Sequence, residues 1–280
     1  MGIFFVFVQL YVSFMHHTGM KTKRHYKYMK HLFQLLSCVC IVACMASCAM
    51  VSGKVSGKGS TQTVQKKLTP GAFNSVCNYS EWDVSFVQAD SSFVLLRGDA
   101  DIISDIDVSL KGTTLTISKK KYAVFTDFDG DVKIVVSSPE LKYVGVSGTG
   151  DFDCKGVLYA ENLGVDLSGT GDADFSDIEC NKMTLKNSGT GDFEAKRIKA
   201  LSFSANSVGT GDVEAVLQGT DDTSLLLYGT GDITIGFIDC VKASCDLSGT
   251  GDITLSGSLQ QLMKSVTGTG DLDTGKLRMR

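Results

Sequence analysis

Residues Ser147–Asp151 read SGTGD, and the last four letters, Gly-Thr-Gly-Asp, return six more times further along the chain. The motif begins at Gly148, Gly169, Gly189, Gly209, Gly229, Gly249 and Gly268, so that successive steps measure 21, 20, 20, 20, 20 and 19 residues. A spacing this regular indicates a repeat architecture in which each repeat builds one structural unit.

Apolar and polar residues alternate on both sides of each motif, as in VDLSGTGDADF at 165–175. Period-two alternation predicts strands with one buried face, and GTGD is then the corner between two strands. Glycine reaches positive φ without steric cost and lets neighbouring backbones approach closely, while aspartate bonds to nearby amides. Two further apolar pairs, such as Ile178 with Cys180 and Met183 with Leu185, predict three short strands in every repeat.

Three strands per ~20 residues, each stacking on its counterpart in the next repeat, predict an all-β fold of the parallel β-helix (solenoid) type. The period-two pattern excludes helical repeats. Residues 61–145 are less regular but still rich in strand patterns, and we expect this N-terminal β portion to cap the open end of the stack. Residues 66–280 are therefore predicted to form a single head domain, with GTGD repeats from 148.

The first 48 residues have the pattern of a secretory leader. A basic cluster after Met20 precedes an apolar run from Leu32 to Cys48, which is short for a membrane-spanning helix. Met45-Ala46-Ser47-Cys48 resembles a bacterial lipobox, so Cys48 is the predicted lipidation site. A membrane anchor or an unlipidated cleaved signal is the alternative. Residues 49–65, with many Gly and Ser, are expected to be a flexible tether.

A second apolar stretch lies within residues 1–19, upstream of this leader. We interpret it as an over-long start, with a two-helix membrane hairpin as the alternative.

Charge and cysteine usage exclude several classes of function. All four histidines, five of the 27 Lys and Arg residues and none of the 31 Asp and Glu residues lie before residue 48, so residues 49–280 carry a net charge of −9. An acidic body without a nucleic-acid-binding motif predicts no nucleic-acid partner.

Five cysteines outside the leader form no CxxC pair and are expected to be small buried hydrophobes: Cys77, Cys154, Cys180, Cys240 and Cys245.

The order of motifs resembles a known bacterial family. It runs from WDVSFVQ at 82–88 through LTISKK at 115–120 to SSPELKYVGVSGTGD at 137–151, followed by glycine-aspartate corners. This order is similar to the putative auto-transporter adhesin, head GIN domain family, over residues 71–275. The resemblance implies a secreted or surface-attached β-helical protein and supplies no catalytic residues. Members more often carry Gly-Ser-Gly-Asp, so threonine is a variation here.

The motif aspartates form a predicted column of carboxylates, with neighbours roughly 5 Å apart at the strand spacing. Like charges that close repel one another, so hydrogen bonds to turn amides are the expected compensation. Binding of Ca²⁺ is the alternative, since calcium prefers oxygen ligands. The members of the column are Asp151, Asp172, Asp192, Asp212, Asp232, Asp252 and Asp271.

These features predict a non-enzymatic, exported lipoprotein of the bacterial cell envelope, attached by lipid to the outer membrane or the cell surface. Its head is expected to be an adhesin-like scaffold or binding module for a glycan or a protein, with no cofactor and no confident metal site. A carbohydrate-active lyase or glycosidase is the alternative, with carboxylate pairs such as Asp151 with Asp153 or Asp172 with Asp174 as acid and base. Repetition argues against it, because catalysis needs one asymmetric site.

Overall fold

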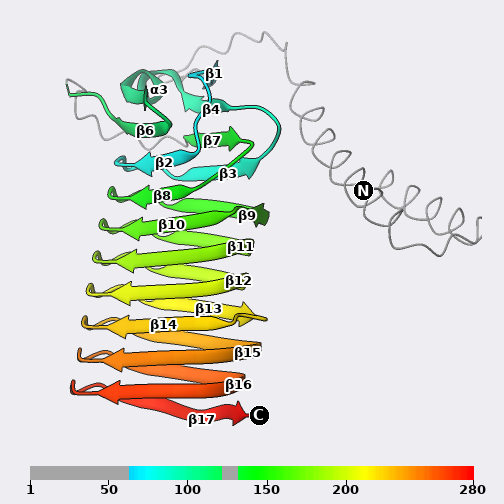
Figure 1. Ribbon diagram of the computed structural model, residues 1–280. Helices are drawn as coiled ribbons and strands as arrows, with labels where there is room; N and C mark the ends of the chain where they lie inside the picture. Colours follow the sequence, from blue (N-terminus) through cyan, green and yellow to red (C-terminus); the bar gives the residue numbers. More distant parts are fainter. Residues whose placement is uncertain (1–62, 122–131) are drawn as a thin grey trace, which may run out of the picture. The chain divides into compact units, whose positions relative to one another are not determined.

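The computed structural model describes residues 63–121 and 132–280 (Figure 1). These residues form seventeen strands and one short helix, α3 (Ala100–Asp105). Residues 1–62, including the leader with Cys48 and most of the predicted tether, lie outside the described residues. Within the described ranges, no helix combines the length and the apolar character needed to cross a membrane. The first strand begins at Thr63, three residues before the expected start of the head.

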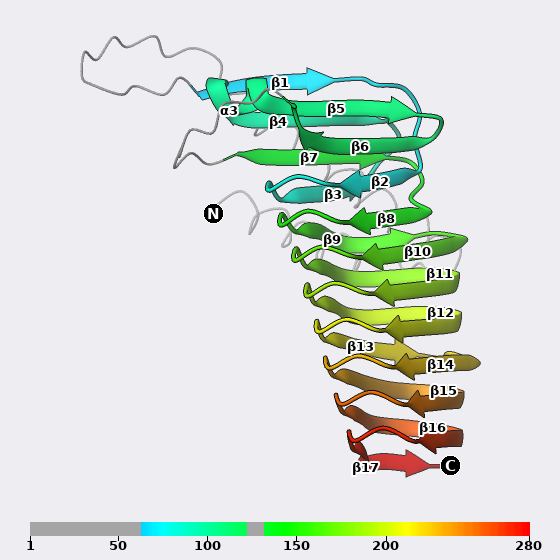
Figure 2. The ribbon, with the colours of Figure 1, turned by 90° about the vertical axis from the view of Figure 1, so that its left-hand side faces the viewer.

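The repeats stack as a parallel β-solenoid, as the sequence predicts (Figures 1 and 2). Equivalent strands of successive coils pair in parallel, so that Ala173, Phe193, Val213, Ile233 and Ile253 lie in one column, 20 residues apart. The strands of the stack are β8 (Tyr143–Val146), β9 (Phe152–Tyr159), β10 (Asn162–Leu167), β11 (Ala173–Asn187), β12 (Phe193–Ser207), β13 (Val213–Gln218), β14 (Asp222–Leu227), β15 (Ile233–Leu247), β16 (Ile253–Val266) and β17 (Leu272–Met279).

The number of strands in each coil differs from the prediction of three. In β11, β12, β15 and β16 one strand of 14 or 15 residues runs from one GTGD corner to the next. The chain bends within these strands and keeps its pairing to the neighbouring coil: Cys180 pairs with Ala200 and Lys182 with Ser202, on either side of the bend. Local alternation cannot distinguish a bend within a strand from a break.

The interior of the stack is a continuous apolar core. Alternate residues of β11 and β12 point inward and are almost fully buried, as the period-two pattern predicts. Phe86, Phe152, Phe175 and Phe193 follow one another, with ring centroids 6.2, 5.7 and 5.8 Å apart. Each such aromatic contact adds about 0.5–1.5 kcal/mol to the burial of the rings. A single coil has no such neighbour, so the stack stabilises itself cooperatively.

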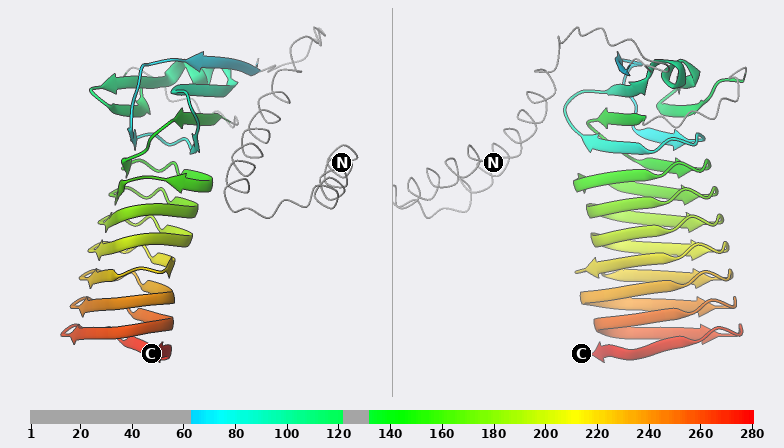
Figure 3. Two further views of the ribbon diagram at one scale, coloured as in Figure 1. Left: turned by 45° about the vertical axis from the view of Figure 1, so that its right-hand side comes forward. Right: turned by 180° about the vertical axis from the view of Figure 1, so that it is seen from behind.

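The N-terminal portion contains one additional coil and a cap. β2 (Ser75–Asn78) pairs in parallel with β8, and β3 (Val84–Gln88) pairs with β9, so these two strands form the first coil of the solenoid. Above them lie β6 (Thr114–Lys119) and β7 (Lys133–Ser138). The remaining strands join by antiparallel pairing (Figure 3): β1 (Thr63–Leu68) with β4, β4 (Phe93–Asp99) with β7, and β5 (Ile106–Lys111) with β6.

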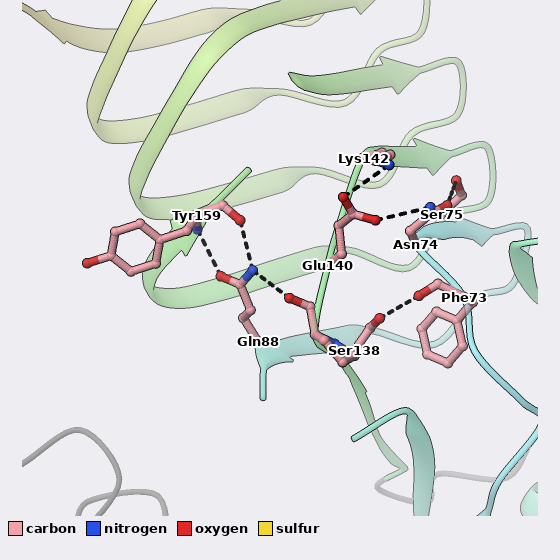
Figure 4. A network of polar contacts seen from close by, with 9 residues as sticks. Phe73, Asn74, Ser75, Gln88, Ser138, Glu140, Lys142 and Tyr159 are labelled. Carbon is pink, nitrogen blue, oxygen red and sulfur yellow. Dashed lines mark hydrogen bonds and ion pairs between the residues drawn. The ribbon is translucent and has the colours of Figure 1, made fainter. Parts of the chain in front are cut away.

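A polar network joins the cap to the first coils (Figure 4). The side-chain amide of Gln88 donates to the carbonyl oxygens of Pro139, at 2.9 Å, and Tyr159, at 2.8 Å. Its amide oxygen accepts from the Tyr159 N–H at 2.8 Å. Ser138 donates to the Phe73 carbonyl in the buried interior. Because antiparallel strands cover the upper coil, the open edge that a solenoid would leave there is closed.

Candidate functional site

The GTGD corners form one edge of the solenoid, and both glycines of each corner are required by the packing of coil on coil. A Cβ on any of these fourteen glycines would lie 2.0–2.3 Å from a carbonyl oxygen of the preceding coil. For Gly211 the distance to the Gly191 oxygen would be 2.0 Å. The expectation of positive φ is wrong here, because the described glycines with positive φ all lie outside the motif. Close approach of backbones is the physical reason for the repeated glycine.

The close approach is used for hydrogen bonding. The carbonyl oxygen of Gly169 accepts from the Thr190 N–H at 3.0 Å and from the Gly191 N–H at 3.4 Å. The same arrangement recurs at the other corners, for example from Thr250 and Gly251 to Gly229. A side chain at the glycine would push the coils apart and break these bonds.

Each motif aspartate from Asp151 to Asp252 accepts a hydrogen bond from the next coil. The Oδ1 atom of Asp172 accepts from the backbone N–H of Asp192 at 2.7 Å, and equivalent bonds of 2.7–2.9 Å join every successive pair from Asp151 to Asp271. Carboxylates that accept such bonds are stabilised in the ionised form. The structure thus brings all seven predicted residues together in one ladder, and this contact offsets the repulsion between neighbours.

The ladder has an eighth member, Asp83, which the repeat spacing did not reveal. Its Oδ1 atom accepts from the Asp151 N–H at 3.1 Å, across 68 residues of sequence. Asp83 stands in the first coil, where Val84 pairs with Phe152. A signal was present: WDVSF at 82–86 has the same order of aspartate and alternating apolar residues as GDVEA at 211–215.

A second row of acids runs beside the ladder in the upper coils. Asp153 pairs with Asp174, and Asp174 pairs with Glu194 in the next coil. Burial first, and then the neighbouring carboxylates, raise the pKa of Asp174 above its ordinary value of 3.8. Burial likewise raises the pKa of Asp151, against the lowering effect of its bond to the Asp172 amide. The carboxylate pairs considered for catalysis therefore recur from coil to coil, and no single pair is distinguished.

Among residues 63–121 and 132–280, no group of three or more His, Cys, Asp or Glu side chains is arranged to hold a metal ion. The calcium hypothesis stays a prediction. The five cysteines in this part of the chain are free thiols, and four of them are buried. Burial raises the pKa of Cys154 to about 12 and those of Cys180 and Cys245 to about 11. Such thiols stay protonated at neutral pH and are poor nucleophiles.

An open groove follows the corners over five coils. Its volume is about 750 Å³, and its lining is Ser, Gly and Thr from each corner, interrupted by Val208 and Tyr228. These two side chains replace the serine of the other lining corners and are 52% and 50% exposed. The threonines of the motif are exposed along the same edge. The groove therefore presents hydroxyl groups at the strand spacing, ~4.8 Å, with one aromatic ring among them.

Comparison with solved structures shows the fold. The chain resembles a putative adhesin from Bacteroides fragilis with a TM-score of 0.68 and 24% identity, over 76% of this chain and 97% of that chain. A protein described as a putative lipid binding protein from Parabacteroides distasonis gives a TM-score of 0.62 at 18% identity, over 77% and 97% of the two chains. A putative adhesin from Parabacteroides merdae gives 0.58 at 19% identity, over the same shares.

A comparison with curated protein sequences finds no match. A family model matches residues 72–235 and 216–280, which include the first coil, the cap except β1, and all seven GTGD corners. The chain therefore belongs to the family described as "Putative auto-transporter adhesin, head GIN domain".

Proposed function

We propose that this protein is an exported, non-enzymatic binding module of the bacterial cell envelope that uses the groove along its GTGD corners to bind a glycan. The observation that carries the proposal is the groove itself, with Tyr228 exposed among repeated Ser and Thr hydroxyls. An exposed aromatic ring offers an apolar face with a polar tip. Hydroxyl groups both donate and accept hydrogen bonds. This combination suits a polyhydroxylated chain lying along the edge.

Attachment by a lipid at Cys48 is part of the same proposal. The leader pattern before Cys48 and the Gly- and Ser-rich residues after it support a lipid-anchored head at the outer membrane or cell surface. Membership of an adhesin-like family supports an exposed location. A repeated edge with equivalent corners supports binding over catalysis, since multivalent contact gains avidity from repetition.

Glycan-array binding of the purified full-length protein tests the proposal, with Tyr228→Ser as the diagnostic variant. Serine is the residue at this position in other corners (Ser168, Ser188, Ser248), so the variant is expected to fold. We expect at least a tenfold loss of affinity, the size expected for one lost aromatic contact of about 1.4 kcal/mol.

The control is Tyr159→Ser, which removes a tyrosine of similar exposure, 41%, outside the groove. Equal affinity of the Tyr228→Ser variant and the unchanged protein would exclude the groove as the glycan site. An array without any bound glycan would contradict the proposed ligand class.

A further inference from the structure

The last coil that the structure describes has an unpaired edge. β17 pairs with β16, and the second half of β16 pairs with β15, while no other described strand pairs with either of these segments. β17 forms the lower end of the stack in Figures 1 and 2. Unpaired N–H and C=O groups on such an edge are a template for further strand pairing.

Several apolar side chains of this coil are exposed, and no described strand covers them. Val266 lies under Leu247, which is fully buried, yet Val266 is 47% exposed. Met279 lies under the buried Leu259 and is 54% exposed. Covering these side chains by another copy would remove apolar surface from water and would favour association.

One residue of the last coil contradicts this apolar pattern. Strand pairing places Lys264 directly under Cys245 in an inward-facing column. From β8 to β15 all other members of the column are apolar and buried, and they are Val144, Val165, Leu185, Ala205, Leu225 and Cys245. Lys264 is exposed, but a further coil below it would cover its ammonium group. Burial of an unpaired ammonium is strongly unfavourable.

The charges on β17 define the geometry that pairing would take. The strand carries Asp273 near its start and Lys276 and Arg278 near its end, and Arg280 follows it. Parallel pairing of two copies would align like charges, whereas antiparallel pairing can place Asp273 of one copy opposite Arg278 of the other. The opposite end of each head is capped by antiparallel strands, so tail-to-tail pairing would close after two copies.

We propose that the C-terminal coil is a latent, two-fold self-association surface for a second copy of this chain, which Lys264 keeps unoccupied. Two-fold pairing brings the inward columns of both copies together, so that both Lys264 side chains enter one apolar interior. Inward-pointing charges of this kind are a known protection of exposed sheet edges. The head consequently stays a single solenoid with its groove unobstructed.

The test measures the mass of the full-length protein in detergent by size-exclusion chromatography with light scattering, at concentrations up to about 100 μM. We expect the unchanged protein to be monomeric and Lys264→Leu to form dimers, with the monomer–dimer dissociation constant lowered at least a hundredfold. Lys186→Leu is the matched control, because it removes an exposed lysine from the wall of the stack, where its neighbours Leu185 and Asn187 point inward. This control should stay monomeric.

Adding Val266→Lys to Lys264→Leu restores a charge at the same edge and should return the protein to monomers. If Lys264→Leu does not fold, Lys264→Ala gives the same test, with weaker dimerisation expected. A dimeric unchanged protein, or a folded Lys264→Leu variant that stays monomeric, overturns the proposal. Assemblies larger than dimers overturn the tail-to-tail geometry.

Discussion

The first corner of the solenoid and the seven GTGD corners form the same turn from different residues. In the first coil the turn is Tyr79–Asp83, with Ser80 and Trp82 at the positions of the two glycines. A Cβ on Gly148 would lie 2.0 Å from the Ser80 carbonyl oxygen, and a Cβ on Gly150 would lie 2.2 Å from that of Trp82. The steric restriction therefore falls on the later coil of each pair. The first corner carries side chains because no equivalent corner lies above it.

The first corner is covered by a side chain. The ammonium group of Lys119, at the end of β6, lies 2.9 Å from a carboxylate oxygen of Glu81 and 5.9 Å from the ring centroid of Trp82. A flexible side chain adjusts to what lies beneath it, whereas a backbone at hydrogen-bonding distance cannot. Glycine in this motif therefore serves coil-to-coil contact, and the turn itself does not require it.

The largest effect on stability is expected when a side chain is added to a motif glycine within the stack. Gly211→Ala places a methyl group against the Gly191 carbonyl, and we expect a loss of at least about 3 kcal/mol in the free energy of unfolding. Chemical denaturation monitored by circular dichroism measures it. Gly236→Ala is the control, because its Cβ would meet only side-chain atoms at ordinary contact distance, of Val216 at 3.4 Å and Ser256 at 3.7 Å. Similar losses for the two variants would refute the role of coil contact.

A buried asparagine gives the second comparison. Asn78 is fully buried and donates to the Trp82 and Gly150 carbonyls, while its oxygen accepts from the N–H and hydroxyl of Ser80. Asn187 occupies the same column and is also fully buried; it donates to the Gly191 and Gly211 carbonyls and accepts from the Gly189 N–H. In other coils this column contains Leu167, Leu227 and Leu247.

We expect Asn78→Leu to lower the free energy of unfolding by about 2–3 kcal/mol, because it leaves several buried groups of the irregular corner without a partner. Asn187→Leu also removes bonds to its corner, but we expect a smaller cost of about 1 kcal/mol, because GTGD corners in other coils form with leucine at this position. Denaturant titration of both variants compares them. An equal cost would mean that the first corner does not depend on its asparagine more than the repeated corners do.

The smallest effect concerns the second row of acids. The first coil has Ser85 in this row, where the next coils carry Asp153 and Asp174. The pKa of Asp174 is raised on folding, so the folded protein loses stability as the pH rises from below 3.8 through that raised pKa. Asp174→Ser should therefore raise the melting temperature at pH 7.

Because the side chain is partly exposed to solvent, the expected rise is about 1 °C or less. The difference should disappear well below pH 3.8, where the carboxyl is protonated in both states. Calorimetry at several pH values measures it, with Thr234→Ser, lower in the same column, as the control. A variant that is less stable at pH 7 would contradict the sign of the shift.

The sequence alone determined the solenoid, its 20-residue coils and the aspartate column, because the alternation of apolar and polar residues and the spacing of the motif recur in every repeat. Only the tertiary structure decided that Asp83 begins the ladder, since 68 residues and the cap separate it from Asp151. The role of the glycines also follows only from the tertiary structure, because it depends on a carbonyl oxygen of another coil. The inward-facing position of Lys264 likewise follows from the register between coils. These features arise from contacts between coils, and such contacts have no expression in the order of residues within one coil.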